Sequence, residues 1–403
     1  MYWATPTKIL RTHCIPIELW LMIWELVCFA RFEDAYCNFA GYNGARDDLS
    51  LSGPPIPHNP LDVIDPCLNE WGLAIRLHPS FWRRLGLDYS TTPAYIERHL
   101  RWCGNLPLDV SLFFEFDSLV TESEDHPDYT LAIHSENLKH RVAVATQSLH
   151  AAVSSSHLWN VVCIWADTFD FMEAILYVLL RVSAPNIASL LFSSPPCYSH
   201  RDRNTTFLFI PPISIFSGSL PGLRSLQLWG TALPWGRKSY YGSINTLDLG
   251  HLPMSIWPRA SELACTLREA VALRHLILGG GGAYVNDENS IPPFIMPSLE
   301  TLTIDYTRDT KTFLLVLAVG SYPALRELDL LNLDPDGWRI LTRVQVLAQV
   351  KTVHLFGSLE DVHHIPWLLA HLSSVNTLDI RATDPWYFDV LTTVHTVHYV
   401  SVQ

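Results

Sequence analysis

The chain has 403 residues, 48% of them hydrophobic and 17% charged, and this balance excludes wholesale disorder and favours a well-buried fold. The formal net charge of −13 argues against a nucleic-acid-binding protein, because phosphate contacts need clustered lysine and arginine side chains. The eight cysteines show neither metal-knuckle spacing nor a disulfide-like array, so a reducing compartment, the cytoplasm or the nucleus, is expected.

The first predicted element is an amphipathic helix over residues 15–26. Pro16 suits the first helical turn, Glu18 carries a carboxylate near the positive helix end, and Leu19 and Ile23 share one face. This is also the most apolar part of the chain, but the two carboxylates within it argue against a membrane span and against a secretory signal. We therefore expect no membrane contact.

Three further elements are expected before the repeats described below. Residues 31–66 are rich in glycine, proline, asparagine and aspartate, which predicts an exposed, disordered insertion. Segment 67–87 carries a Cys-x-x-x-Trp pattern followed by Pro-Ser-Phe-Trp. A helix is expected over 94–103, and it leads to a strand over 106–112.

Several of these segments resemble parts of the F-box family. The first helix is similar to the L-P-x-E-I/L-x-x-x-I pattern that opens an F-box, and segment 67–87 resembles the closing segment of fungal F-box-like proteins. The sequence departs from the family at Asn69-Glu70, where an arginine is usual. The resemblance implies an all-helical head over residues 1–107. The residues that it assigns to adaptor contact are Ile15, Pro16, Leu19 and Ile23. The alternative is that residues 1–107 only cover the first repeat.

An L-x-x-L-x-L pattern recurs through the rest of the chain. Its first positions are 223, 244, 273, 299, 325, 350, 375 and 394, with less regular members at 158 and 187. From 273 onward the copies lie 26, 26, 25, 25 and 19 residues apart, and in four copies a proline stands two residues before the first apolar position. Apolar residues between copies recur at helical spacing, for example over 338–347 and 362–372. The pattern predicts a strand–helix unit repeated along one axis.

This pattern resembles the leucine-rich-repeat family, which implies an α/β fold. We expect a solenoid over residues 108–403, with a parallel curved sheet and outer helices. The alternative is a generic α/β domain with leucine-rich strands. The last strand pattern stops near Gln403 without a polar cap, which indicates either a truncated chain or a poorly ordered end.

Residues that would carry chemistry are scarce. Gly279–Gly282 is not followed by the Lys-Ser or Lys-Thr of a phosphate-binding loop, and no G-x-S-x-G elbow is present. The adjacent His363 and His364 point about 100° apart on a helix, which does not suit a shared metal ion. We expect no catalytic residue, no metal and no cofactor.

The expected binding residues lie between the buried leucines. The third, fifth and seventh positions of each copy point to the opposite face of the sheet. On that face the aromatic residues are potential anchors, and the carboxylates favour a partner with a basic segment. The residues selected are Trp229, Asp248, Asp305, Glu327, Asp329, His354, Phe356 and Asp379. The alternative is that these side chains are merely solvated.

Together the two resemblances imply a substrate receptor of a cullin–RING ubiquitin ligase. The head would bind a Skp-family adaptor within the cullin complex, and the repeats would bind an unidentified protein substrate. The chain would then supply binding and proximity, not catalysis. The alternative is a leucine-rich-repeat scaffold with no ligase role. An enzyme would need a convergent polar cluster, which the sequence does not reveal.

Overall fold

A computed structural model describes the part of the chain considered from here on. Its residues are 79–88, 91–114, 127–166, 169–194, 212–285, 291–305, 311–331, 350–356 and 377–381. The predicted adaptor contacts lie outside these residues, as do the insertion at 31–66, the expected helices at 338–347 and 362–372, and the last copy of the pattern at 394.

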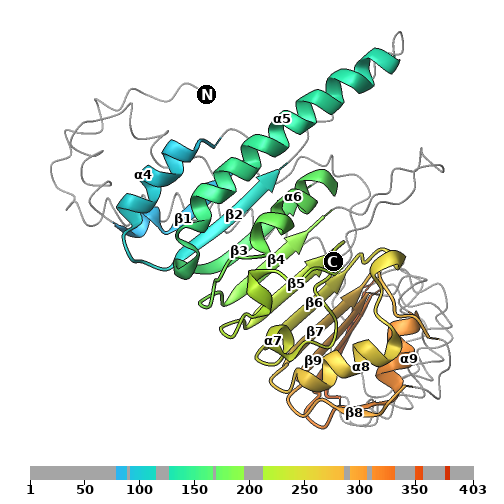
Figure 1. Cartoon of the computed structure of the whole chain (residues 1–403). Coiled ribbons are helices and arrows are strands. Elements are labelled where there is room, and N and C mark those ends of the chain that lie inside the picture. The colour runs from blue at the N-terminus through green and yellow to red at the C-terminus, as the bar shows by residue number, and fades with distance from the viewer. Residues whose placement is uncertain are drawn as a thin grey trace, which may run out of the picture.

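The described residues form an α/β structure on one parallel sheet of eleven strands (Figure 1). Each strand pairs with its neighbours in chain order, apart from β8 (Phe294–Ile295) and β10 (Gly320–Ser321), which pair with each other. The eleven strands are β1 (Arg84–Leu87), β2 (Leu108–Phe114), β3 (Trp159–Ala166), β4 (Ser189–Ser193), β5 (Ser225–Trp229), β6 (Thr246–Gly250), β7 (His275–Gly279), β9 (Thr301–Asp305), β11 (Glu327–Leu331), β12 (Thr352–Phe356) and β13 (Thr377–Arg381). The strands expected from the pattern at 223 to 375 are therefore confirmed.

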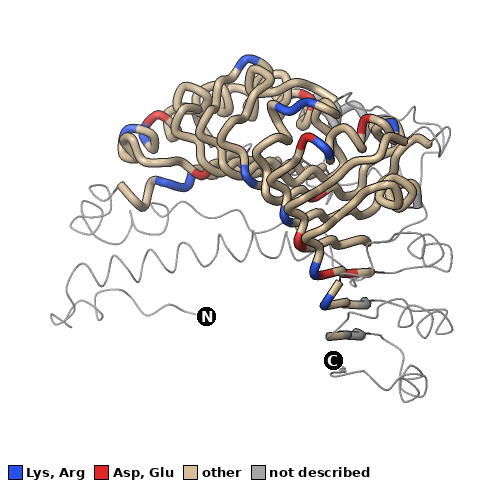
Figure 2. Tube along the Cα trace, turned by 90° about the horizontal axis from the view of Figure 1, so that it is seen from below, with Lys and Arg blue, Asp and Glu red and all other residues tan. Residues whose placement is uncertain are grey.

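The helices lie together on one side of this sheet (Figure 1). They are α4 (Pro93–Cys103), α5 (Pro127–Val153), α6 (Phe169–Leu179), α7 (Lys238–Tyr241), α8 (Ala260–Glu269) and α9 (Lys311–Ala318). Seen from below, the row of strands bends, and its last members descend away from the rest of the sheet (Figure 2). None of the described helices is both long enough and apolar enough to cross a membrane.

Local sequence explains where two of the helices begin. In α4 the Thr92 hydroxyl accepts a hydrogen bond from the backbone N–H of Tyr95 at 3.3 Å, and Pro93 fills the first helical position. In α8 the carboxylate of Glu262 accepts a hydrogen bond from the backbone N–H of Arg259 at 2.8 Å. The helix predicted over 94–103 is thus confirmed as α4.

Strand β1 corrects the prediction of an all-helical head. Arg84–Leu87 pairs in parallel with β2, and Leu85 and Leu87 are fully buried. The buried Trp82 just before it makes an edge-on contact with His99 of α4, with ring centroids 5.2 Å apart. The segment is strand because its two leucines, spaced by two, enter the same core as the leucines of β2.

The repeating units stack in one register through their backbones. In six places the carbonyl just before a strand accepts two hydrogen bonds, at 2.6–3.1 Å, from consecutive N–H groups of the next unit. The accepting residues are Ala188, Arg224, Asn245, Arg274, Glu300 and Arg326. The leucines of each pattern then meet in one core between sheet and helices, as in the β5 unit, where Leu223, Leu226 and Leu228 are fully buried.

Candidate functional site

The face of the sheet opposite the described helices, here called the open face, carries the predicted binding residues. In β5 the side chains of Ser225, Gln227 and Trp229 are partly exposed, whereas the two leucines between them are buried. The same alternation holds in β9 and through the first four residues of β11, so the expected orientation of the third and fifth positions is confirmed there. Phe356 and Asp379 occupy the corresponding register positions on β12 and β13.

Strand register aligns open-face residues from distant parts of the sequence into rows across the sheet. One row continues from Gln227 on β5, and its part on the next six strands, here called the central row, contains Asp248, Ile277, Thr303, Asp329, His354 and Asp379. Adjacent strands lie about 4.8 Å apart, so neighbouring members of this row are within reach of one another. The sequence identified most of these residues but not their alignment.

A hollow lies on the open face around Asp248, and we call it the Asp248 hollow. It holds about 350 Å³ of empty space, part of it open to solvent. Two glycines, Gly250 and Gly279, stand side by side in register between Trp229 and Asp305. Both glycines are buried, because the Trp229 ring lies against Gly250 and the Asp305 side chain lies against Gly279. The lining residues are Trp229, Asp248, Gly250, His251, Ile277, Gly279, Thr303, Asp305 and Leu331.

Among the carboxylates that the sequence singled out and whose burial the structure describes, Asp248 is the most buried. The residue is only 6% exposed, so it does not fit the alternative in which the side chains of this face are merely solvated. Burial raises the pKa of Asp248 to about 6, and a hydrogen bond from the Trp229 side chain acts in the opposite direction. Trp229, the expected aromatic anchor, is partly buried and packs edge-on against His251, with ring centroids 6.4 Å apart.

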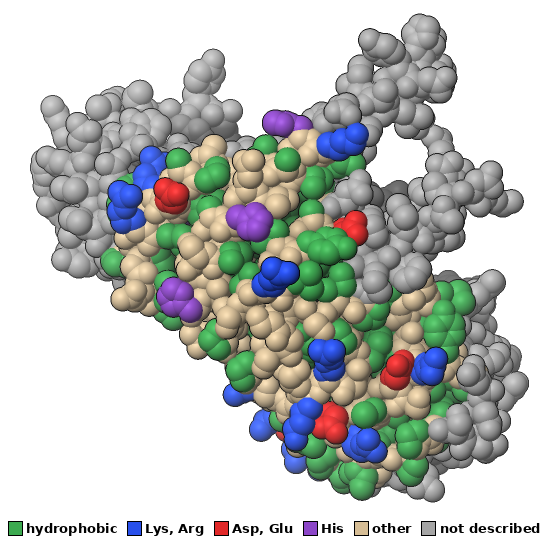
Figure 3. Space-filling model, in the orientation of Figure 1, with side chains coloured by type: hydrophobic (Ala, Val, Ile, Leu, Met, Phe, Trp, Pro, Cys, Tyr) green, Lys and Arg blue, Asp and Glu red, His purple; other side chains and the backbone are tan. Residues whose placement is uncertain are grey.

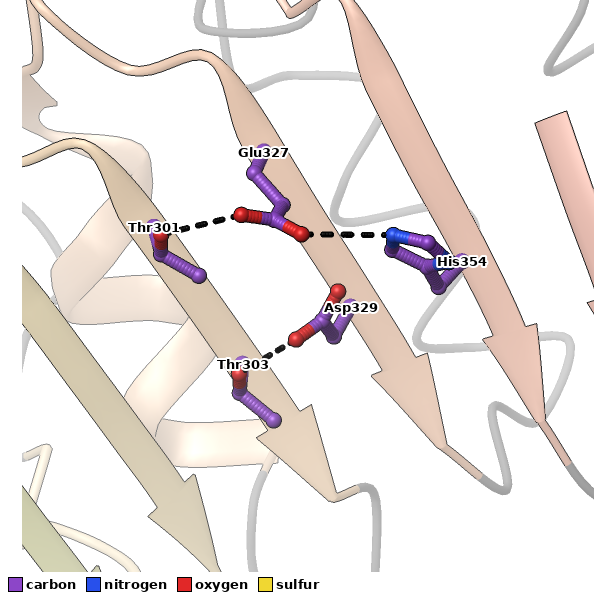
Figure 4. A network of polar contacts seen from close by, with 5 residues as sticks. All are labelled: Thr301, Thr303, Glu327, Asp329 and His354. Carbon is purple, nitrogen blue, oxygen red and sulfur yellow. Dashed lines mark hydrogen bonds and ion pairs between the residues drawn. The ribbon is translucent and has the colours of Figure 1, made fainter. Parts of the chain in front are cut away.

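A second polar cluster, the Glu327 cluster, lies farther along the open face (Figure 4). His354 Nε2 lies 3.2 Å from Glu327 Oε1. Thr301 Oγ1 donates a hydrogen bond to Glu327 Oε2 at 3.2 Å, and Thr303 Oγ1 donates one to Asp329 Oδ2 at 2.8 Å. Threonines on β9 therefore orient both carboxylates of β11, while β12 supplies the imidazole.

Within the Glu327 cluster, Asp329 has a shifted pKa. Burial raises the pKa of Asp329, and the charge of Glu327 acts in the same direction, while the Thr303 hydrogen bond and His354 lower it. The other oxygen of this carboxylate, Oδ1, is buried without a hydrogen-bond partner. One ligand-type atom each from Glu327, Asp329 and His354 lie within 4.8 Å of one another, so among the described residues these three could hold a divalent cation. Two of the three, Glu327 and His354, also contact each other directly.

The open face changes character toward β2, β3 and β4. There Phe113, Cys163 and Leu191 form a buried apolar cluster that Trp165 packs against, separate from the main core. Burial raises the pKa of the Cys163 thiol to about 12, so this cysteine stays protonated and is not a nucleophile. The sequence contained a signal for this cluster, because apolar residues occupy both faces of these strands instead of alternating with polar ones.

Charges are separated between the open face and the edge where the strands begin. The residue just before a strand is an exposed cation in four units, namely Arg224, Arg274, Arg326 and Lys351. No open-face position of the described strands from β5 to β12 carries lysine or arginine, whereas four carry carboxylates. On the helix-covered side, charged side chains are scattered among hydrophobic ones (Figure 3). The sequence signal for the basic edge is the cation at the second position of those copies.

Six of the eight residues predicted for the open face fall into two groups, and Phe356 and Asp379 belong to neither. The structure brings Trp229, Asp248 and Asp305 together around the hollow, and it brings Glu327, Asp329 and His354 together in the neighbouring cluster. Sequence reasoning left His251, Gly250 and Gly279 out of the site. Comparison of the chain with models of known protein families gave no match, and comparison with curated proteins gave none.

Proposed function

We propose that this chain is a leucine-rich-repeat protein that binds a protein partner on the open face of its sheet. Three observations support the repeat assignment. The strands pair in chain order, successive strands from β7 to β13 begin 26, 26, 25 and 25 residues apart, and the same backbone hydrogen bonds recur between units. Such an array offers an extended binding surface instead of an enclosed active site.

The observation that carries the binding function is the composition of the open face between β5 and β12. It combines a partly buried tryptophan, a hollow and four carboxylates without any lysine or arginine among the described strands. Aromatic residues in well-packed pockets dominate the energetics of many protein interfaces. An acidic surface also accelerates association with a basic partner. The partner is therefore a protein with a basic segment.

For the N-terminal segment we propose adaptor binding, as the F-box resemblance implies. Ile15, Pro16, Leu19 and Ile23 would contact a Skp-family adaptor of a cullin–RING ubiquitin ligase, and the open face would hold the substrate. In this arrangement the chain supplies proximity and its partners supply the chemistry. The second candidate is a repeat scaffold without a ligase role. It is favoured by the departure from the family pattern at Asn69-Glu70.

One capture experiment with three forms of the full-length chain tests both halves of this proposal. The unaltered chain, immobilised in a cell lysate, should retain an adaptor and one or more further proteins. The double change Pro16→Ala and Leu19→Ala should lose the adaptor and keep the others. The double change Ser225→Arg and Thr352→Arg, which puts cations on the open face, should do the reverse.

The control and the contrary outcomes follow from the same design. Ser261→Arg adds a cation at an exposed position of α8, outside the open face, and should retain every protein. Failure of purified chain and adaptor to co-elute at micromolar concentration would remove the ligase role and leave the scaffold. Equal retention by the open-face variant and the unaltered chain would remove the open face as the binding surface.

A further inference from the structure

We propose that Glu327, Asp329 and His354 form a binding site for one zinc ion on the open face of the sheet. The inference goes beyond the proposed function, because it concerns an ion that the chain would bind without any partner. The sequence predicted no metal, since the histidine stands one repeat after the two carboxylates. Only the pairing of β11 with β12 brings the three residues together.

The three side chains converge on one point of the open face. Glu327 and Asp329 stand two residues apart on β11 and share a face, and His354 stands opposite Asp329 on β12. One potential ligand atom of each residue lies within 4.8 Å of the other two. His354 Nε2 and Glu327 Oε1 are 3.2 Å apart. Two ligands of a tetrahedral zinc ion, with bonds of about 2.0–2.1 Å, stand about 3.3–3.4 Å apart, so this pair already has nearly the required separation.

An oxygen of Asp329 is the second observation that points to a ligand. Its Oδ2 accepts the hydrogen bond from Thr303, but Oδ1 is buried and has no hydrogen-bond partner. In Figure 4 this second oxygen points toward the gap between Glu327 and His354. The direct contact of those two side chains satisfies both of them and leaves Oδ1 unpaired. A cation in the gap would contact all three groups and remove the cost of a buried, unpaired carboxylate oxygen.

The threonines of β9 orient both carboxylates for this role. Thr301 and Thr303 stand in register with Glu327 and Asp329. Each threonine hydroxyl donates to one carboxylate oxygen, so each carboxylate keeps its other oxygen for an ion. Carboxylate ligands of protein-bound metals are hydrogen-bonded in the same way, and loss of such a bond typically weakens metal binding by about 10–100-fold.

The donor set selects zinc over calcium and magnesium. Calcium and magnesium take oxygen ligands, whereas imidazole suits zinc and other transition-metal ions. The two carboxylates of the cluster balance the double positive charge of the ion. The side chains of Glu327 and His354 are 43% and 23% exposed, so an ion can enter from the open face. Three protein ligands leave the fourth tetrahedral position to solvent.

Cobalt(II), which occupies zinc sites and absorbs visible light strongly when its coordination is tetrahedral, tests the site in the full-length chain. The purified chain is freed of metal with a chelator and titrated with cobalt chloride. We expect about one cobalt ion per chain to give this absorption, without the near-ultraviolet band of cysteine ligation. An equal concentration of zinc should remove the absorption, whereas calcium or magnesium in about 100-fold excess should not.

Variants assign the absorption to these three residues. His354→Gln and Asp329→Asn each remove a ligand and should weaken cobalt binding by more than about 100-fold, and Thr303→Val should weaken it by about 10-fold. His275→Gln is the matched control, because His275 is an exposed histidine in the same row as Glu327, two strands away. It should bind cobalt as the unaltered chain does. Urea unfolding in the presence of chelator shows that each variant is folded.

Three results would overturn the zinc site. They are the absence of tetrahedral cobalt absorption, its removal by calcium or magnesium as readily as by zinc, and its retention at full affinity in His354→Gln or Asp329→Asn. The proposed function is tested separately, because the titration needs no partner. Capture of proteins in the presence of chelator examines the open face without metal, so either proposal can fail while the other stands.

Discussion

At the scale of single residues, the most informative group is the carboxyl group of Asp248, because folding disfavours its ionised form. Asp248 is 6% exposed, and its pKa of about 6 lies above the value of about 3.9 expected for an unfolded chain. The folded protein therefore holds the proton more tightly than the unfolded chain does. The contribution of Asp248 to stability is fully present below about pH 4, declines as pH rises, and is lost above about pH 6.

This sign leads to a prediction for Asp248→Asn, which keeps the shape and removes the charge. We expect the free energy of unfolding at pH 7.5 to rise by about 1–2 kcal/mol, somewhat less than the pKa shift alone implies, because asparagine accepts a weaker hydrogen bond from Trp229. The advantage should shrink as pH falls from 6 to 4. Urea unfolding of both proteins across this range measures it.

The contrary results are specific. A variant less stable than the unaltered chain at pH 7.5 would show that Asp248 is stabilised by its surroundings. A stability difference that does not change with pH would show that the effect comes from packing. A gain in stability together with loss of partner capture by the open face would make Asp248 a residue at which function opposes stability.

At the scale of single elements, a buried side-chain hydrogen bond helps to hold the short helix α7 in place. Tyr240 of α7 is fully buried, and its hydroxyl donates to the backbone carbonyl of Ile215 at 2.6 Å. This bond attaches the helix to the segment that precedes β5. Burial raises the pKa of the Tyr240 hydroxyl, so it keeps its proton and remains a donor at neutral pH.

We predict that Tyr240→Phe lowers the free energy of unfolding by about 1–2 kcal/mol, because the Ile215 carbonyl is then buried without its donor. Tyr177→Phe on α6 is the matched control, since that side chain is 60% exposed, and it should change stability by less than about 0.5 kcal/mol. Chemical denaturation of the two variants and the unaltered chain measures these differences in the free energy of unfolding. Equal effects would mean that the buried hydroxyl contributes nothing particular.

The sequence predicted some of these elements and missed others for identifiable reasons. Leucines at fixed spacing predicted β5, β6, β7, β9, β11, β12 and β13, because the copies of the pattern place their apolar residues at the same positions of a shared core. Strand β1 was missed because its four residues contain only two leucines and stand beside a helical motif. The buried state of Asp248 was missed because it depends on Trp229 and Gly250, which pairing of β5 with β6 brings together. The alternation of apolar and polar residues predicts the face of the sheet on which a side chain lies. It does not predict how far residues on neighbouring strands bury that side chain.

At the scale of the whole molecule, the separation of charge follows from the repeat itself. A cation stands before the strand in four units, and carboxylates stand on the open face of three strands. Because the units stack in one register, residues at the same position of different units lie side by side. Cations before several strands therefore form a basic border, and carboxylates on the open face form an acidic surface beside it. The Asp248 hollow was harder to predict, since insertions make the earlier copies 21 and 29 residues apart and obscure which residues are neighbours.

The register of the sheet also fixes the distances between carboxylates along a row, and so the spacing of basic residues that a bound peptide needs. Asp248 and Asp329 stand in one row three strand intervals apart, a distance of about 14 Å. An extended peptide that crosses the strands advances about 3.4 Å per residue. About four of its residues therefore span the distance between Asp248 and Asp329. Insertion or deletion of a single residue between two basic positions of such a peptide would break that coincidence without altering its charge.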